Sequence, residues 1–183
     1  GPLFTAGVVI LACILPFTVR NYRVYGRFLL LNSNTGYAMY SAQHPMHGID
    51  FQEYGAAPLP DDLLQSDMNE AELDSELLRR GIGFVLDDPV RYVRLSWSRL
   101  LDYLSILPEP STTPLHAVGR LVGYGLYAPF ILYGLILVLC SRDLRERSLL
   151  ALLFILCYSV VHVFTWAMVR YRLPVDAVAM PFV

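Results

Sequence analysis

Three long apolar runs constrain this chain more than any other feature of its sequence. They cover residues 3–19, 121–140 and 148–169, and none contains Arg, Asp or Glu. A helix rises 1.5 Å per residue, so a run of roughly 20 residues crosses the ~30 Å hydrocarbon core of a bilayer. We expect each run to be a transmembrane helix, and we interpret the shorter first run as truncated at its start.

The composition supports a membrane protein and excludes several other classes. The chain is 55% hydrophobic and 13% aromatic, which is too apolar for an ordinary soluble domain. Its net charge of −2 gives no basic face for nucleic acid, so we expect no nucleic-acid partner. All three cysteines lie inside apolar runs, where we expect small buried side chains rather than a disulfide framework.

The polar region of residues 20–119 carries signals for two amphipathic helices. Asn69 and Glu72 have the spacing of a capping box, which predicts a helix near residues 70–85. Asp88 followed by Pro89 predicts the start of a second helix over residues 89–107. This helix could lie in the membrane interface, but we interpret its apolar stripe as a packing surface. The stripe consists of Val90, Val93, Trp97, Leu100, Leu101, Leu104 and Leu107.

The start of the polar region has weaker signals. Residues 28–31 are apolar and could form a short strand. Residues 32–36 predict a turn or a helix start, with Ser33 or Asn34 as the cap. We expect residues 44–50 to be irregular.

The charges of the short loops predict which loops face the cytoplasm. Residues 141–147 form a short turn with three arginines between two apolar runs, which favours the cytoplasm. Alternation of the spans then places residues 20–119 and the corner that begins at Arg170 on the extracytoplasmic side. We expect residues 170–183 to contain this corner and the start of a further span. The predicted fold class is an all-α membrane protein with a largely helical extracytoplasmic loop region.

Four segments carry a resemblance to a known family. They are Pro16-Phe-Thr-Val-Arg-Asn-Tyr-Arg-Val-Tyr-Gly-Arg27, Asn32-Ser-Asn-Thr-Gly-Tyr37, Asp88-Pro-Val-Arg-Tyr92 and Arg170-Tyr-Arg-Leu-Pro174. In this order they resemble the bacterial membrane glycosyltransferases of family 39 and the dolichyl-phosphate-mannose mannosyltransferases. Ser41-Ala-Gln-His-Pro45 stands where the family often has a Gly-Asn-Asn-Pro-like segment, a difference that bears on sugar or acceptor specificity.

The resemblance implies a fragment of a polytopic GT-C helical bundle in a bacterial inner membrane. Such enzymes move a sugar from a polyprenyl-phosphate donor to a lipid, glycan or protein acceptor on the outer face, as in cell envelope glycosylation. The chain would be the C-terminal half, and the acidic general base would lie in the remaining N-terminal half of the same protein. We therefore expect no catalytic residue within this chain.

Arginines at two membrane corners are the candidate ligands for the lipid phosphate. Guanidinium groups bind phosphate with planar, bidentate hydrogen bonds and stay charged at any depth, although these side chains could also simply reach lipid headgroups. The candidates are Arg20, Arg23, Arg170 and Arg172. Candidate contacts to the donor or acceptor are Asn21, Tyr22, Asn34, Tyr37, His44 and Tyr171.

Two further hypotheses stay open at this stage. His44, His47 and Asp50 have a spacing that could hold a divalent metal, whereas polar contacts of the loop would use the same residues. His162, inside the third run, fits either a hydrogen bond within the bundle or a site residue. The competing function is a non-enzymatic flippase or transporter of lipid-linked glycans, which would need the arginines but no general base.

Overall fold

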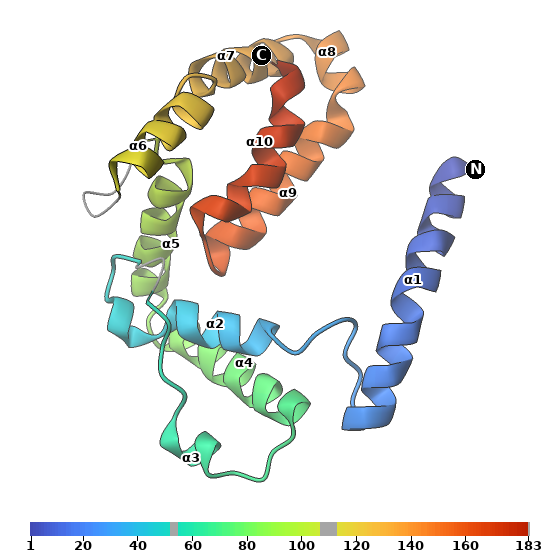
Figure 1. Cartoon of the computed structure of the whole chain (residues 1–183), viewed down its shortest axis with the longest axis vertical. Helices are drawn as coiled ribbons and strands as arrows, with labels where there is room; N and C mark the ends of the chain where they lie inside the picture. The colour runs from blue at the N-terminus through green and yellow to red at the C-terminus, as the bar shows by residue number, and fades with distance from the viewer. Residues whose placement is uncertain (52–54, 107–112, 183) are drawn as a thin grey trace. The chain divides into compact units, whose positions relative to one another are not determined.

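The computed structural model describes residues 1–51, 55–106 and 113–182, and every regular element in these ranges is a helix (Figure 1). The predicted all-α class is therefore confirmed for this part of the chain. The α-helices are α1 (Pro2–Tyr25), α2 (Thr35–Gln43), α3 (Asp61–Leu64), α4 (Glu70–Asp87), α5 (Pro89–Leu104), α6 (Pro114–Arg120), α7 (Ala128–Cys140), α8 (Arg142–Arg147), α9 (Leu149–Phe164) and α10 (Leu173–Ala179). Short 3₁₀ or π segments are η1 (Pro45–His47), η2 (Leu121–Gly125), η3 (Val169–Arg172) and η4 (Met180–Phe182).

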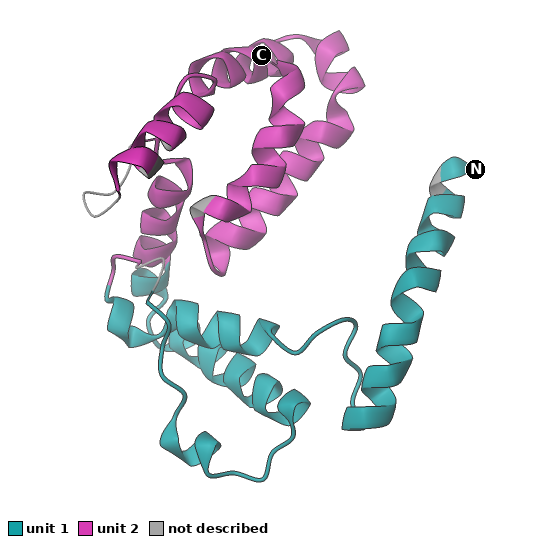
Figure 2. Cartoon of the chain, in the orientation of Figure 1, with its two compact units in different colours: residues 1–48, 54–92 teal, residues 49–53, 93–183 magenta. Residues whose placement is uncertain are grey.

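The chain divides into two compact units (Figure 2). Unit 1 consists of Gly1–Gly48 and Tyr54–Tyr92, and unit 2 consists of Ile49–Glu53 and Val93–Val183. Unit 1 contains α1 to α4, and unit 2 contains most of α5 and all later helices.

The first apolar helix continues beyond the predicted end at residue 19. α1 runs to Tyr25 and includes Pro16 without a break. It stops at Gly26, whose φ of 67° lies in the left-handed region and whose N–H donates to the carbonyl of Tyr22 at 2.9 Å. Glycine adopts this conformation without a steric cost, which explains where α1 ends.

The strand predicted at residues 28–31 is not present, because side chains of α1 bind the backbone of this segment. The Thr18 hydroxyl donates to the carbonyl of Leu30 at 2.8 Å. The Asn21 amide donates to the carbonyls of Leu29 at 3.3 Å and Leu31 at 2.9 Å. Both side chains are buried, so the segment is tied to α1 by hydrogen bonds that would otherwise go to a neighbouring strand.

Helices α2 and α4 lie side by side and form the centre of unit 1 (Figure 1). Two glycines permit this close approach: a methyl group on Gly36 would overlap the backbone carbonyl of Asp74, and one on Gly81 would lie 2.7 Å from the backbone nitrogen of Tyr40. Around this contact, a small core forms from Tyr40, Ala57, Leu63 and Leu77.

The predicted start of α2 is confirmed, but the capping bond does not come from Ser33 or Asn34. Asn34 holds the N-cap position, but its side chain makes no capping bond. Instead, the carboxylate of Asp74 in α4 accepts from the N–H groups of Gly36 at 2.8 Å and Tyr37 at 3.2 Å. A carboxylate satisfies the unpaired N–H groups of a helix start and opposes its positive dipole end.

The predicted starts of the next two helices are confirmed. Asn69 accepts from the N–H of Glu72 at 3.0 Å, and Glu72 accepts from the N–H of Asn69 at 3.1 Å, which completes the capping box. Asp88 accepts from the N–H of Arg91 at 2.9 Å and so caps α5. α4 ends at Asp87 rather than 85 and α5 at Leu104 rather than 107, the latter position lying outside the described residues.

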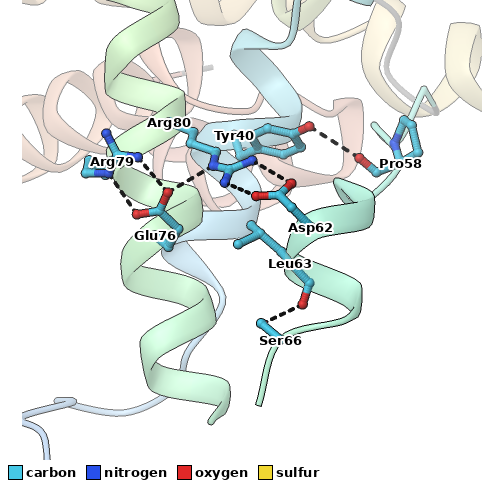
Figure 3. A network of polar contacts seen from close by, with 8 residues as sticks. All are labelled: Tyr40, Pro58, Asp62, Leu63, Ser66, Glu76, Arg79 and Arg80. Carbon is cyan, nitrogen blue, oxygen red and sulfur yellow. Dashed lines mark hydrogen bonds and ion pairs between the residues drawn. The ribbon is translucent and has the colours of Figure 1, made fainter. Parts of the chain in front are cut away.

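A charged network attaches α3 to α4 (Figure 3). Arg80 donates to both carboxylate oxygens of Asp62, at 2.5 and 3.2 Å, and to Glu76 at 3.0 Å. Arg79 donates to the same Glu76 carboxylate at 2.6 and 2.7 Å. The network is half-exposed. Its contribution to the stability of unit 1 depends on whether Asp62 and Glu76 are ionised.

We expect unit 1 to lose stability as the pH falls from about 4.5 to 2. Hydrogen bonds from Arg79 and then Arg80 hold the pKa of Glu76 at about 2, compared with an ordinary value of 4.5, and Arg80 lowers the pKa of Asp62. A carboxylate whose pKa is depressed by folding stabilises the folded state above its unfolded pKa and loses that contribution as acid protonates it. Thermal unfolding followed by circular dichroism across this pH window measures the effect. The slope should be smaller in Glu76→Gln, and equal slopes in both proteins would contradict the assignment.

Unit 2 contains the other apolar helices, and their bounds differ from the prediction. The run at 121–140 forms a π segment, η2, followed by α7, and the helix before it, α6, begins already at Pro114. The run at 148–169 is helical only to Phe164, where the Thr165 hydroxyl donates to the carbonyl of Val161 at 2.6 Å. The turn predicted at 141–147 is the helix α8, supported by two ion pairs of i,i+4 spacing.

Within the described residues, two helices are long and apolar enough to cross a membrane, Phe4–Tyr25 and Ala117–Cys140. Helix α9 is apolar but shorter. It runs beside α10 (Figure 1).

The apolar stripe of α5 does not pack inward, contrary to the prediction. Val90, Val93, Trp97, Leu101 and Leu104 are all more than half exposed. The buried residues of α5 are those on its other side, Leu95, Ser96, Arg99 and Tyr103.

Candidate lipid-phosphate site

Two of the four predicted phosphate ligands lie on the last turns of α1. Arg20 and Arg23 are both exposed, as is the neighbouring Tyr22. Arg20 donates to the side-chain oxygen of Asn21 at 3.2 Å, and Arg23 lies in the final turn, where a positive charge complements the helix dipole. The buried Asn21 uses its amide to hold the following segment, so its role in this structure is structural.

Unlike three other arginines of unit 1, Arg20 and Arg23 form no ion pair with a carboxylate of the described residues. Arg27 pairs with Glu72 at 3.6 Å, and Arg79 and Arg80 belong to the network of α3 and α4. The charge of Arg20 nevertheless acts on the Glu70 carboxyl, whose pKa it helps to lower.

Glu70 is the acid that the structure brings to the end of α1, a contact that no pattern in the sequence predicts. Its carboxylate accepts from the Tyr25 hydroxyl at 2.7 Å and from the Ser33 hydroxyl. These bonds, led by that of Ser33, lower the pKa of Glu70. A lowered pKa makes a carboxylate a weaker proton acceptor, so Glu70 is poorly suited to be a general base.

The predicted donor or acceptor contacts in α2 are mostly engaged within unit 1. The Tyr37 hydroxyl donates to the carbonyl of Ala57 at 3.0 Å, and Asn34 is exposed at the start of the helix. His44 packs edge-on against Tyr40 and Phe84, with ring centres 5.3 and 5.5 Å apart. Burial, with the charge of Arg91, lowers the pKa of His44. Sugar contacts by these residues stay predictions.

A metal site at residues 44–50 gains no support from the geometry. Nδ1 of His44 accepts from the N–H of Met46 at 3.2 Å, and Nε2 of the buried His47 lies 3.0 Å from the carbonyl of Ser41. In residues 1–51, 55–106 and 113–182, no group of three His, Cys, Asp or Glu side chains is placed to hold a metal ion.

The two arginines of the second corner have different environments. Arg170 is exposed, and its guanidinium lies 5.3 Å from the centre of the Tyr171 ring. Tyr171 in turn stacks on His162 at 4.6 Å, so the histidine of the third run supports this corner through ring contacts. Like Arg20, Arg170 forms no ion pair with a carboxylate of the described residues.

Arg172 is buried, with only 3% of its surface exposed. It donates to the carbonyls of Tyr103 at 2.8 Å and Ser105 at 3.1 Å, and to the carboxylate of Asp176 at 3.2 Å. Its guanidinium carbon lies 3.3 Å from the centre of the Tyr124 ring. These contacts assign Arg172 a structural role in unit 2. Phosphate binding by this side chain stays a prediction.

Each pair of corner arginines lies within a single unit. Arg20 and Arg23 belong to unit 1, and Arg170 and Arg172 belong to unit 2. A phosphate shared by both corners stays a prediction.

Comparisons of the chain with protein-family models, with curated proteins and with solved structures gave no match.

Proposed function

We propose that this chain is the C-terminal half of a membrane glycosyltransferase that uses a polyprenyl-phosphate-linked sugar. In this proposal, α1, the segment Ala117–Cys140 and the shorter apolar helix α9 cross the bilayer of a bacterial inner membrane, so residues 20–119 and the corner at Arg170 are extracytoplasmic. Arg20, Arg23 and Arg170 bind the donor phosphate. The general base lies in the N-terminal half of the same protein.

The observation that carries the proposal is the set of exposed, carboxylate-free arginines at the ends of apolar helices. Arg20 and Arg23 lie on the last two turns of α1, a helix long and apolar enough to span a membrane. Arg170 follows α9 after a short connection. Guanidinium groups at the ends of apolar helices meet the depth at which a lipid phosphate lies, and they bind it with charge-assisted hydrogen bonds.

The proposed chemistry needs positive charge at that depth. As the glycosidic bond breaks, the leaving lipid phosphate gains negative charge, and fixed guanidinium groups stabilise the charge that develops in the transition state. The acceptor hydroxyl loses its proton to the general base. Glu70 is poorly suited to this part, because its bonds to Ser33 and Tyr25 lower the pKa of its carboxyl.

The test replaces these arginines one at a time in the whole membrane protein. We expect Arg20→Gln, Arg23→Gln and Arg170→Gln each to reduce sugar transfer from a polyprenyl-phosphate donor by about 10²-fold, the usual effect of losing one electrostatic ligand of a transition state. Arg142→Gln is the control, because Arg142 is equally exposed but lies in α8, on the predicted cytoplasmic side.

The outcomes separate the two candidate functions. Unchanged transfer in all three variants would refute phosphate binding by these residues. Loss of glycan translocation in a protein that transfers no sugar would instead favour the flippase or transporter.

A further inference from the structure

One side of α5 is an exposed apolar surface within unit 2. Val93, Trp97, Leu101 and Leu104 are 65, 61, 54 and 53% exposed, and they follow each other at spacings of three and four residues. Residues at this spacing share one face of a helix, so they form a continuous stripe. We name this surface the α5 stripe.

Contacts on the opposite side of α5 determine which face of the helix points outward. Arg99 is fully buried, with its guanidinium 4.9 Å from the centre of the Phe51 ring. Tyr103 is also buried; its hydroxyl lies 3.4 Å from that of Ser159, and its carbonyl accepts from Arg172. Turning the stripe inward would break these contacts, so the stripe faces outward in the folded unit.

A shallow groove of about 560 Å³ borders the stripe. Its lining combines the apolar side chains of Ile49, Val93, Trp97 and Leu101 with the polar side chains of Asp50, Arg94, Ser98 and Asp102. Apolar groups next to charges of both signs suit the boundary between acyl chains and zwitterionic headgroups.

We propose that the α5 stripe lies in the membrane interface and binds the surface of a lipid bilayer. The chain keeps α5 within a limited distance of the membrane, because the apolar segment Ala117–Cys140 begins shortly after Leu104. The twelve residues in between span at most about 45 Å when fully extended. Tryptophan is enriched at this depth because its ring is apolar and its N–H remains hydrated.

The inference rests on the membrane-spanning part of the proposed function and not on sugar transfer. The two can therefore fail separately. Extraction at alkaline pH reports whether the protein is integral to the membrane, and the fluorescence of Trp97 reports the docking of α5.

The experiment places Trp97 relative to the bilayer. The unchanged full protein and its Trp97→Phe variant are each reconstituted in vesicles of phosphatidylcholine with bromine at defined acyl positions, and the difference between their emissions is the signal of Trp97. Trp166 and any other tryptophan contribute to both emissions and cancel in the difference. We expect quenching of the Trp97 signal to be strongest for bromine near the headgroup, at a depth of about 5–10 Å, with little quenching by aqueous iodide.

A pair of matched variants tests the stripe itself. Val93→Glu should reduce lipid quenching of Trp97 by at least about twofold, because a carboxylate on the apolar face opposes its burial in the acyl region. Leu86→Glu introduces the same group at an equally exposed position of α4 and should leave the quenching unchanged.

Three results would overturn the proposal. Strong iodide quenching of Trp97 without lipid quenching would show that the α5 stripe is exposed to water and not bound to the bilayer. Crosslinks between copies through Val93→Cys, without lipid quenching, would show a second copy on the stripe. Release of the protein at alkaline pH would overturn the docking together with the membrane-spanning part of the proposed function.

Discussion

Replacing Arg172 with Gln is expected to destabilise unit 2 by about 3–5 kcal/mol, the usual effect of removing one partner of a buried ion pair. The change removes the donors of three hydrogen bonds, to Tyr103, Ser105 and Asp176, and the contact with the Tyr124 ring. The shorter Gln side chain cannot reach all of these groups. It therefore leaves the Asp176 carboxylate, which is only 19% exposed, without its positive partner.

Arg170→Gln is the matched control for this prediction. It removes the same group two residues away, but Arg170 is exposed and contacts only the ring of Tyr171. We expect its effect on stability to be within about 0.5 kcal/mol. Chemical unfolding of the reconstituted protein measures both variants. Equal stability of the two would show that the buried contacts of Arg172 contribute little.

The variants Arg170→Gln and Arg172→Gln also separate an effect on stability from an effect on sugar transfer at the second corner. Under the proposed function, Arg170→Gln loses sugar transfer with its stability intact. Arg172→Gln loses stability first, and any loss of activity follows from that. A variant of Arg172 that is fully folded but fails to bind the donor would restore the direct phosphate role predicted for this residue.

The second large effect is expected where α2 meets α4. Gly81→Ala would place its methyl group 2.7 to 2.9 Å from backbone atoms of Met39 and Tyr40. Alanine favours a helix by about 1 kcal/mol over glycine, but backbone atoms cannot move aside as side chains do. We expect a net loss of about 1–3 kcal/mol, as for other overpacked sites. Gly36→Ala should cost more, because its methyl group would overlap the carbonyl of Asp74 directly.

Gly83→Ala provides the control within the same helix. Nothing lies within 4 Å of a methyl group at this position, so only the gain in helix propensity remains. We expect a stabilisation of up to about 1 kcal/mol. Thermal unfolding of the three variants measures the difference, and a destabilised Gly83→Ala together with an unchanged Gly81→Ala would contradict the close contact.

The parts of the fold that the sequence predicted correctly depend on neighbouring residues. The capping box of Asn69 and Glu72 and the cap of Asp88 both join residues three positions apart, and both are present. Such bonds follow from local geometry alone. The apolar runs were recognisable for the same reason, because their hydrophobicity is a property of a continuous segment.

The incorrect predictions concern contacts with residues outside the segment whose pattern was analysed. The cap of α2 comes from Asp74, which is 38 residues away from Gly36. The strand at 28–31 is absent because Thr18 and Asn21 take its carbonyls, and no pattern in residues 28–31 indicates this. Sequence periodicity correctly gave α5 as an amphipathic helix, but it could not say which face is covered by protein.

The same limit applies to the candidate site. The sequence placed four arginines at two corners, and it could not separate the exposed Arg170 from the buried Arg172 two residues later. Burial of Arg172 depends on carbonyls in α5 and on Asp176, which only the folded unit brings together. The contact of Glu70 with Tyr25 spans 45 residues and was equally inaccessible.

The bonds from Thr18 and Asn21 to residues 29–31 also bear on the order in which this chain can fold during synthesis. These bonds join residues only 8 to 12 positions apart, whereas those between α2 and Asp74 join residues 37 and 38 apart. Short-range contacts form quickly, and the N-terminal part of a chain leaves the ribosome first. The bonds from α1 to residues 29–31 can therefore form while α4 is still being translated. The segment that leads to α2 is then already held against α1 when Asp74 emerges to cap α2.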